Sequence, residues 1–308
     1  MIPNNQAIFF VILSTAVFAL GDTVVKLLTQ KGSIWQLMLL RSILVILFLW
    51  IWVRLKGRWR DIVPTSFGWP LVRAGFMCLA YTLSYSAYPF ASLSDVAACF
   101  FTAPIFVCIF AALFFKEKVG IWRISAVIIG FSGALLIIQP GSTEFRPVLI
   151  MPVLAGACYA AGVVVTRGFC ADQPSLALTA IHNVFYAVLA VSVVSLMPIF
   201  TIDPKIVAQN PFLFRDWAPL TTAILLMIIA TAILHIIAMT ASIRAYQIAE
   251  STFVAPIEYT YLVFAAGIDF ALWAVLPSST TLIGITLVVG SGILITLREL
   301  AAKKSQID

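Results

Sequence analysis

Charged residues are scarce in this chain: only 10% of its 308 residues are Asp, Glu, Lys or Arg, whereas 62% are hydrophobic. A soluble domain has roughly 25% charged and 45–50% apolar residues, and a globule of this length cannot hide so much apolar surface from water. The composition therefore excludes a water-soluble fold and indicates an integral membrane protein. Helices of about 20 residues with short connections use up the whole length, so no soluble domain is expected.

Motifs of nucleotide-driven pumps and of membrane enzymes are also missing. The sequence has no P-loop, no Gly-rich dinucleotide fingerprint, no HExxH and no nucleophile elbow. Its five cysteines form neither a pairable framework nor a metal-ligand spacing, and four of them lie in apolar runs. We therefore expect no catalytic residues, no cofactor, no metal and no disulfide.

The N-terminus lacks the features of a cleaved signal peptide. Residues 1–6 contain no Lys or Arg, and the apolar run from Ala7 continues past Gly21 without an A-x-A cleavage site. We expect this first segment to be a retained helix.

The net charge of +6 does not indicate nucleic-acid binding. The densest basic cluster directly follows an apolar run, and no basic face alternates with aromatic residues. Basic residues at such positions hold loops on the cytoplasmic side of a membrane, so no nucleic-acid partner is expected. The cluster comprises Arg54, Lys56, Arg58 and Arg60.

What the sequence does contain is a series of about ten apolar segments, each long enough for a membrane helix. With the N-terminus inside, 13 of the 19 basic residues fall on the cytoplasmic side, which predicts that both termini are cytoplasmic in a bacterial-type inner membrane. The segments are 7–28, 34–53, 70–88, 93–115, 119–139, 148–167, 177–198, 218–242, 251–274 and 279–297.

An internal repeat relates the first five segments to the last five. Because five is odd, the second copy enters the membrane with the opposite orientation, and such inverted repeats are a recurring plan of secondary transporters. A shift of 141 residues also lays Arg41 on His182. The matching stretches are 18–21 with 159–162, 102–105 with 254–257, and 133–137 with 292–296.

At these residues the chain resembles the drug/metabolite transporter superfamily, specifically its EamA-type ten-helix members. The resemblance lies in residues 18–26 (FALGDTVVK), 93–106 (LSDVAACFFTAPIF), 115–120 (FKEKVG) and 244–259 (RAYQIAESTFVAPIEY). It implies an all-α fold of ten transmembrane helices as a 5+5 inverted repeat, with a central cavity and transport without ATP hydrolysis. The two repeats would be residues 1–140 and 141–308. The acidic residue usual in the turn after the ninth helix is absent here, which weakens any role for that loop.

Ionisable side chains inside apolar segments are costly and usually face a cavity or a partner. Asp22 and Arg41 lie at a similar depth, about 10 Å from the outer ends of neighbouring helices. Three interpretations remain open for them: an ion pair that holds the hairpin together, binding of a charged substrate group, or snorkelling to the membrane surface.

Four further ionisable residues lie in apolar segments. Glu258 is either satisfied by a hydroxyl such as that of Tyr259 or Tyr261, or couples transport to protons or binds a cation. His182 and His235 are either hydrogen-bonded packing residues or proton relays. Asp95 is expected to be a first-turn residue that favours a helix N-terminus.

Small, aromatic and proline residues complete the candidates. The deeply placed Tyr81, Tyr85, Tyr159 and Tyr259 either pack or line a cavity, where an aromatic box would suit a planar or cationic solute. Pro104 and Pro256 occupy equivalent places in the two repeats and are candidate hinges or plain kinks. Close helix approach is expected at four glycines. These are Gly130, Gly133, Gly290 and Gly292.

The sequence thus predicts a secondary active transporter that moves a small polar or amphipathic metabolite by alternating access, with proton coupling as one option. Amino-acid, nucleoside-like and vitamin-like compounds are candidate substrates. The alternative is a passive channel or facilitator, or a lipid-handling membrane scaffold. The expected partners are a small metabolite and membrane lipid, in either a monomer or a homodimer.

Overall fold

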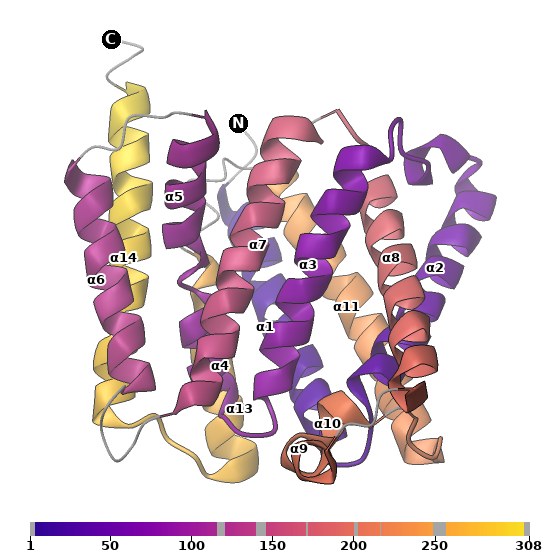
Figure 1. Cartoon of the computed structure of the whole chain (residues 1–308). Coiled ribbons are helices and arrows are strands. Elements are labelled where there is room, and N and C mark those ends of the chain that lie inside the picture. Colours follow the sequence, from indigo (N-terminus) through magenta and orange to yellow (C-terminus); the bar gives the residue numbers. More distant parts are fainter. Residues whose placement is uncertain are drawn as a thin grey trace.

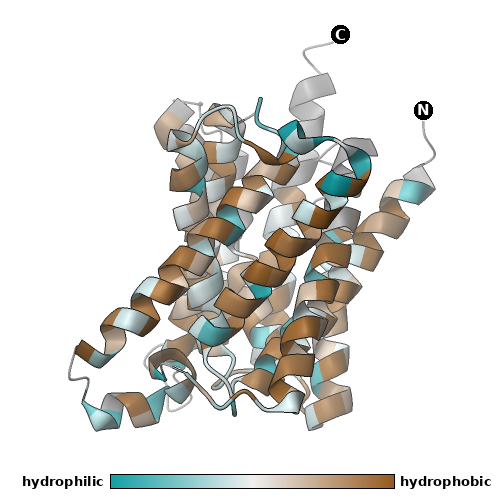
Figure 2. Cartoon of the chain, turned by 90° about the vertical axis from the view of Figure 1, so that its right-hand side faces the viewer, coloured by the Kyte–Doolittle hydropathy of each residue, from teal (hydrophilic) through white to brown (hydrophobic). Residues whose placement is uncertain are grey.

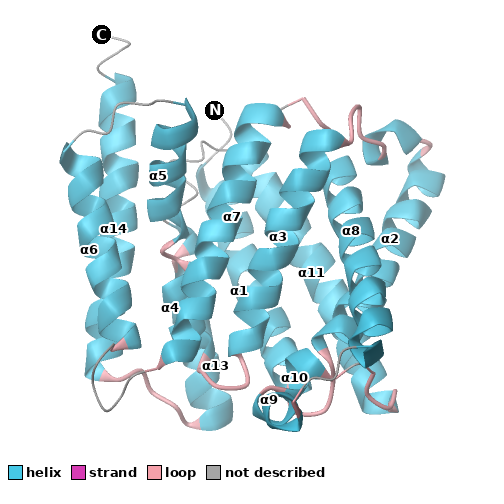
Figure 3. Ribbon diagram, viewed as in Figure 1, coloured by secondary structure: helices cyan, strands magenta, loops and turns pink. Residues whose placement is uncertain are grey.

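The computed structural model describes residues 4–115, 121–139, 146–170, 172–199, 203–215, 217–248 and 257–304. These residues form a bundle of helices with no strand among them (Figures 1 and 3). A helix suits lipid because it satisfies its backbone hydrogen bonds within one segment. The α-helices are α1 (Asn4–Leu28), α2 (Ile34–Lys56), α3 (Gly68–Ala87), α4 (Leu93–Phe100), α5 (Ala103–Phe115), α6 (Ile121–Ile138), α7 (Ile150–Phe169), α8 (Ser175–Leu196), α9 (Pro204–Gln209), α10 (Pro211–Phe214), α11 (Thr222–Ile248), α13 (Thr260–Trp273) and α14 (Ser279–Lys304).

Several of these helices can cross a membrane by length and apolar composition. Within the described residues, five are both long and apolar enough, and shorter apolar helices accompany them. Figure 2 shows that the helices are apolar over most of their length, while hydrophilic residues gather at the two ends of the bundle. The chain is therefore a multi-pass membrane protein. The five are Gln6–Leu28, Ile34–Lys56, Pro147–Thr166, Leu176–Ile199 and Thr222–Met239.

The segment predicted as one helix over 93–115 is in fact two helices, and that prediction was wrong. α4 ends at Phe100 and α5 begins at Ala103, with a turn between them. Pro104 has no backbone N–H, so the Phe100 carbonyl four residues earlier cannot receive its helical hydrogen bond. At the second position of α5 the missing N–H carries no penalty.

The basic cluster predicted to face the cytoplasm begins in the last turn of α2, with Arg54 and Lys56, and continues beyond its end. Gly57 ends that helix in the left-handed conformation, with φ 68°, and its N–H donates to the Val53 carbonyl. Only glycine adopts this conformation without steric cost. The chain then passes through a short 3₁₀-helix, η1 (Trp59–Ile62), where Arg58 pairs with Asp61 at 2.8 Å.

Helices from the two halves of the chain interleave. The most extensive packing joins α1 to α11, α3 to α7, α2 to α8 and α6 to α14. Each of these pairs takes one helix from the first half and one from the second. Figure 1 shows α6 and α14 side by side at the left of the bundle, and α2 and α8 at the right.

Small residues make this interleaving possible. Lipid tails are as apolar as leucine, so membrane helices associate through close packing rather than through a hydrophobic driving force. Fully buried alanines accordingly lie along the contacts, on α1, α3, α7, α8, α11 and α13. They include Ala19, Ala74, Ala155, Ala160, Ala190, Ala238 and Ala265.

Glycines bring α6 and α14 even closer. A Cβ at Gly133 would lie 2.7 Å from the Gly284 carbonyl oxygen, and a Cβ at Gly284 would lie 2.7 Å from the Gly133 oxygen. The predicted close approach is confirmed at Gly130, Gly133 and Gly292, where a Cβ would collide with a neighbouring helix. It was wrong at Gly290, where a Cβ would meet nothing within 4 Å.

The start of α1 and the end of α14 lie at the same end of the bundle, the upper end in Figure 1. The short helices α9 and α10 lie at the opposite end.

Candidate functional site

A cavity lies where helices of both halves meet inside the bundle. It is lined by α1, α2, α3 and α11 and has room for about one water molecule. Its walls are apolar at Val17, Phe18, Val25 and Leu234. The polar groups that face it are Asp22, Arg41, Tyr85, Thr231 and His235.

The Tyr85 hydroxyl stands between the two charged groups of this cavity. It accepts a hydrogen bond of 3.4 Å from Arg41 Nη1 and donates one of 3.3 Å to Asp22 Oδ1. Among the described residues no ion pair joins Asp22 to Arg41 directly. The first of the three open interpretations, a direct ion pair within the hairpin, is therefore replaced by a pair linked through a phenol of α3.

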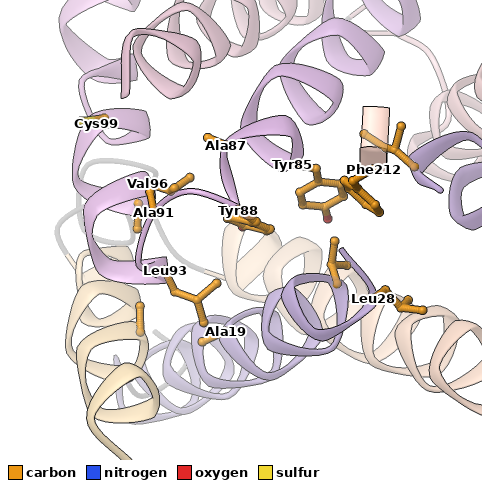
Figure 4. Close-up of a cluster of buried hydrophobic side chains, with 14 of the residues drawn as sticks. Ala19, Leu28, Tyr85, Ala87, Tyr88, Ala91, Leu93, Val96, Cys99 and Phe212 are labelled. Atoms are coloured by element: carbon orange, nitrogen blue, oxygen red, sulfur yellow. The ribbon is translucent and has the colours of Figure 1, made fainter. Parts of the chain in front are cut away.

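Asp22 lies inside a group of three tyrosines. Besides Tyr85, the Tyr261 hydroxyl from α13 donates to Asp22 Oδ2 at 2.5 Å, and Tyr88 at the end of α3 lies near the same carboxyl. Figure 4 shows Tyr85 and Tyr88 facing α1, where Ala19 lies. The carboxylate thus receives neutral hydrogen bonds from elements far apart in the sequence, which stabilises a charge away from water.

Arg41 is only 2% exposed and has few partners for a guanidinium. Nη1 donates to Tyr85, Nη2 lies 3.0 Å from Met38 Sδ, and Nε makes no hydrogen bond in the described part of the chain. The rings of Tyr81 and Tyr85 lie 5.8 and 5.9 Å from its Cζ, within reach of cation–π attraction. Since Arg41 is buried, snorkelling to the membrane surface was the wrong interpretation.

The two histidines occupy different places. His235 lines the cavity and packs edge-on against Phe18, with ring centroids 6.2 Å apart. His182 lies behind Tyr81, at 5.7 Å between ring centroids, and its Nδ1 is 3.7 Å from Cys78 Sγ. The structure therefore brings His235 to Asp22 and Arg41, whereas His182 reaches Arg41 only through the ring of Tyr81.

A second aromatic row follows the break between α4 and α5. Tyr159 packs on Phe100 at 5.3 Å between ring centroids, and Phe101 contacts Tyr259 at 5.2 Å and Tyr261 at 5.9 Å. Tyr261 connects this row to Asp22. Of the four predicted tyrosines, Tyr85 lines the cavity, Tyr81 lies beside Arg41, and Tyr159 and Tyr259 belong to this row.

Glu258 lies away from the cavity lining, one residue before Tyr259. It is partly exposed and acts electrostatically on Tyr159 and Tyr259. The predicted hydroxyl partners were wrong, because Tyr261 donates to Asp22 and the Tyr259 hydroxyl has no hydrogen-bond partner in the described residues. Pro256 lies outside the described residues.

Comparisons with known proteins match this architecture. Residues 5–139 match the EamA-like transporter family. The riboflavin transporter of Vibrio cholerae is 25% identical to this chain, over 83% of this chain and 79% of its own length. The pseudopaline exporter CntI of Pseudomonas aeruginosa is 24% identical over 92% of this chain and 94% of its own. The S-adenosylmethionine uptake transporter of Rickettsia bellii is 23% identical over 75% of this chain and 72% of its own length.

Over both halves, the chain is therefore similar to transporters of the drug/metabolite superfamily. The relatives are named as metabolite transporters, and none of these three names is that of an enzyme. A crystal structure of another protein has the same fold, with a TM-score of 0.57 and 18% identity over 96% of this chain and 98% of that chain. The shared fold therefore extends over both halves.

The structure also contains a charged cluster that sequence reasoning missed. Asp269 of α13 is fully buried and pairs with Lys26 of α1 at 3.2 Å. Its carboxylate also accepts hydrogen bonds from the backbone N–H groups of Leu93 and Ser94 and from the Ser94 hydroxyl. Asp269 thereby caps the N-terminus of α4, where a negative charge is favourable. The rule that found the other ionisable residues applies equally to this one, which lies inside the 251–274 segment.

The predicted first-turn position of Asp95 in α4 is confirmed, and it has a further role. Its backbone N–H donates to the Ser92 hydroxyl, which caps α4. Its carboxylate pairs with Arg146 at 2.8 Å and accepts a hydrogen bond from Thr281 at 3.3 Å. Asp95 thus joins α4 to Arg146, which precedes α7, and to Thr281 of α14. Asp269 joins α4 to α1 and α13. We call these two ion-paired carboxylates the outer cluster, after the side of the membrane that the sequence predicts for this end of α4.

Proposed function

We propose that this protein is a secondary transporter that moves a small polar or amphipathic metabolite across a bacterial inner membrane by alternating access. The observation that carries the proposal is the cavity, which is lined by both halves of a membrane protein and contains Asp22 and Arg41. Ionisable groups at such depth are retained chiefly where they bind a solute or an ion. In this proposal Asp22, Arg41, Tyr85 and His235 form the substrate site.

Alternating access requires two bundles that can exchange roles, and the order of helix packing supports a 5+5 inverted repeat of residues 1–140 and 141–308. In this repeat α1 corresponds to α7, and α3 corresponds to α11. Exchanging the two halves therefore turns the α1–α11 contact into the α7–α3 contact. The α2–α8 and α6–α14 contacts are each exchanged with themselves. The proposal includes ten crossings with both termini in the cytoplasm.

The size of the cavity supports a site that has to open. Pockets that hold a drug-sized ligand have volumes of about 300–1,000 Å³, whereas this cavity has room for about one water molecule. On the predicted outer side the outer cluster ties α1, α4 and α13 together. We expect these contacts to break when the site opens outward.

Proton coupling is a further part of the proposal, with Asp22 and Glu258 as the two candidate carboxylates. Asp22 lies in the cavity, whereas Glu258 lies behind the Tyr159–Tyr259 row. An imposed pH gradient should therefore drive accumulation in the wild type and in Glu258→Gln, but not in Asp22→Asn. If Glu258→Gln alone loses gradient-driven accumulation, the coupling role belongs to Glu258.

The substrate and the direction must come from experiment, because the relatives' names include riboflavin, pseudopaline and S-adenosylmethionine and both export and uptake. The test is uptake of radiolabelled S-adenosylmethionine, riboflavin, nucleosides and amino acids by proteoliposomes that contain the purified chain. Preloading with the unlabelled solute should accelerate uptake, because a carrier returns faster when loaded.

Counterflow also separates this proposal from its alternative. A passive channel would equilibrate each solute without acceleration by preloading, and a lipid-handling scaffold would move lipid but none of these solutes. The matched control is Arg41→Ala, which should abolish uptake while the protein remains in the membrane. Uptake without acceleration would contradict alternating access.

A further inference from the structure

We propose that Arg73 of α3 is a second binding position for an anionic group of the transported solute, on the side of the cavity that the sequence predicts to be cytoplasmic. The inference rests on the proposed transport function and on its inverted repeat. Such a repeat gives each residue of the cavity a counterpart in the other half of the bundle.

Two sequence shifts define these counterparts. A shift of 141 residues relates α1 and α2 to α7 and α8, and a shift of 158 relates α3 to α11. The second shift lays five residues of α3 on identical residues of α11, and the alanines among them are buried in both helices. The five are Ala80, Thr82, Ser84, Ala87 and Tyr88, which match Ala238, Thr240, Ser242, Ala245 and Tyr246.

The counterparts of the cavity residues also lie together. Arg73 Nε donates a hydrogen bond of 2.8 Å to Thr166 Oγ1 of α7, and Arg73 acts electrostatically on His182 of α8. α3 and α7 pack side by side (Figure 1), as α1 and α11 do around the cavity. The same helix positions therefore meet a second time. The correspondences are Asp22 with Val163, Val25 with Thr166, Arg41 with His182, Thr231 with Arg73 and His235 with Met77.

The second meeting place differs from the cavity in charge. Val163 replaces the carboxylate of Asp22, and Arg73 replaces the hydroxyl of Thr231. Arg73 is partly exposed, and within the described residues it has no ion pair and uses only Nε in a hydrogen bond. A guanidinium has five N–H donors, and a carboxylate or phosphate can accept two of them in parallel. This place therefore suits an anionic group.

Arg73 also lies at the end of a row of side chains that begins at the cavity. Tyr85 lines the cavity, and Tyr81, Met77 and Arg73 follow at intervals of four residues toward the predicted cytoplasmic end of α3. The Tyr81 ring lies 5.8 Å from Arg41 Cζ, and Arg73 acts electrostatically on the same tyrosine. Arg73 is about 12 Å along the helix from Tyr81. An anionic group that leaves Arg41 toward the cytoplasm would therefore meet Arg73 next, in a separate step.

Met77 fills the second place in this conformation. A Cβ at Gly162 would lie 2.8 Å from Met77 Cε, so this side chain packs directly on α7. At the equivalent Gly21, which lines the cavity, a Cβ would meet only Leu234, at 3.7 Å. One of the two equivalent places is thus open while the other is filled. Methionine is flexible and adapts its shape, so Met77 can move aside when the bundle opens to the cytoplasm.

The experiment measures the entry of labelled solutes from each face of the membrane. Right-side-out and everted vesicles from cells that produce the full chain present opposite faces to the medium, and vesicles without the chain give the background. The probes are pairs with and without an anionic group. S-adenosylmethionine and its decarboxylated form test a carboxylate, whereas adenosine 5′-monophosphate with adenosine and riboflavin 5′-phosphate with riboflavin test a phosphate.

Arg73→Gln should raise the KM of a transported anionic probe by about tenfold or more from the cytoplasmic face. The KM from the outer face should stay close to that of the wild type, because Arg41 receives the solute there. The member of the pair that lacks the anionic group should respond little from either face.

Three variants separate binding from a structural role. Thr166→Val removes the hydrogen bond to Arg73 but keeps the cation, so it should shift the KM equally for both members of a pair. Arg73→Lys keeps a charge without the bidentate donors and should lie between the wild type and Arg73→Gln. Arg54→Gln removes an exposed cation at the same predicted end of the bundle and should leave every KM unchanged. If Arg73→Gln does not fold, Arg73→Lys and Thr166→Val decide.

The outcomes that contradict the proposal are distinguishable. An equal effect of Arg73→Gln on both members of a pair, or no effect from the cytoplasmic face, would refute the anion site and leave the transport function intact. Transport restricted to probes without an anionic group would do the same. Failure of every probe to enter vesicles that contain folded protein would refute the transport function and the inference together.

Discussion

Tyr261 and Asp22, 239 positions apart, are joined by a hydrogen bond of 2.5 Å from the phenol to Oδ2. The contact connects the first membrane helix to α13 in the second half of the chain. It also orients the carboxylate whose other oxygen faces Tyr85 and, through it, Arg41. The geometry of the cavity thus depends on a tyrosine that does not line it.

Tyr261→Phe should therefore affect both stability and transport. Hydrogen bonds to charged groups contribute about 1.5–3 kcal/mol, so the free energy of unfolding should fall by about that amount and transport should slow. Unfolding in detergent and proteoliposome uptake are the measurements. The control is Tyr186→Phe, which removes a neutral hydrogen bond of 2.8 Å to Thr82 from another buried tyrosine and should cost only about 0.5–1.5 kcal/mol. If both variants lost the same unfolding free energy, the charge on Asp22 would not strengthen its hydrogen bond with Tyr261.

Asp269→Asn should destabilise the protein strongly. The change removes the negative charge that Lys26 pairs with and weakens the cap on α4, and breaking a buried pair costs about 3–5 kcal/mol. Asp61→Asn, in the exposed Arg58–Asp61 pair, should cost less than about 1 kcal/mol. Chemical unfolding of the three proteins in the same detergent gives the comparison. If Asp269→Asn left the free energy of unfolding unchanged, the outer cluster would not hold α4 in place.

Two glycines on one helix should respond oppositely to the same change. Gly284→Ala places a Cβ 2.7 Å from the Gly133 carbonyl oxygen and 2.5 Å from Ile137 Cγ1, so α6 and α14 must separate, at a cost of about 1–3 kcal/mol. Gly290→Ala meets nothing within 4 Å and removes a flexible residue from α14, which should leave stability unchanged or raise it by up to about 1 kcal/mol. Melting temperatures in detergent suffice, and a reversed order would refute the packing of these helices.

Reporter fusions should verify the proposed orientation. Green fluorescent protein fused after Arg60 or at the C-terminal end should fluoresce, because both points are predicted to be cytoplasmic. Alkaline phosphatase fused after Gln209, in the connection that contains α9, should be active, because that side is predicted to lie outside. The opposite pattern would reverse the predicted topology, and a mixture of the two would change the number of crossings.

The helices themselves could be predicted because apolar length alone defines a membrane segment. The predicted 34–53 and 70–88 segments lie within three residues of α2 and α3 at each end. The break at Phe101 was missed because apolar composition continues across it. The consequence of Pro104 for the Phe100 carbonyl could have been derived from the sequence.

The site could be predicted only in part. An ionisable residue in an apolar run is visible in sequence, which identified Asp22 and Arg41. Which side of a helix faces the interior is not visible, because membrane helices are apolar all round and lack the periodicity that orients a soluble helix. The bridging position of Tyr85 and the partnership of Asp269 with α4 therefore required three-dimensional packing.

The cap that Asp269 provides has a consequence for biosynthesis. The N–H groups of Leu93 and Ser94 receive their acceptor from a residue that the ribosome adds about 175 positions later. Until α13 enters the membrane, the start of α4 has to find other acceptors, which are scarce in lipid. The first five segments therefore gain this cap only after the second half of the chain has been synthesised.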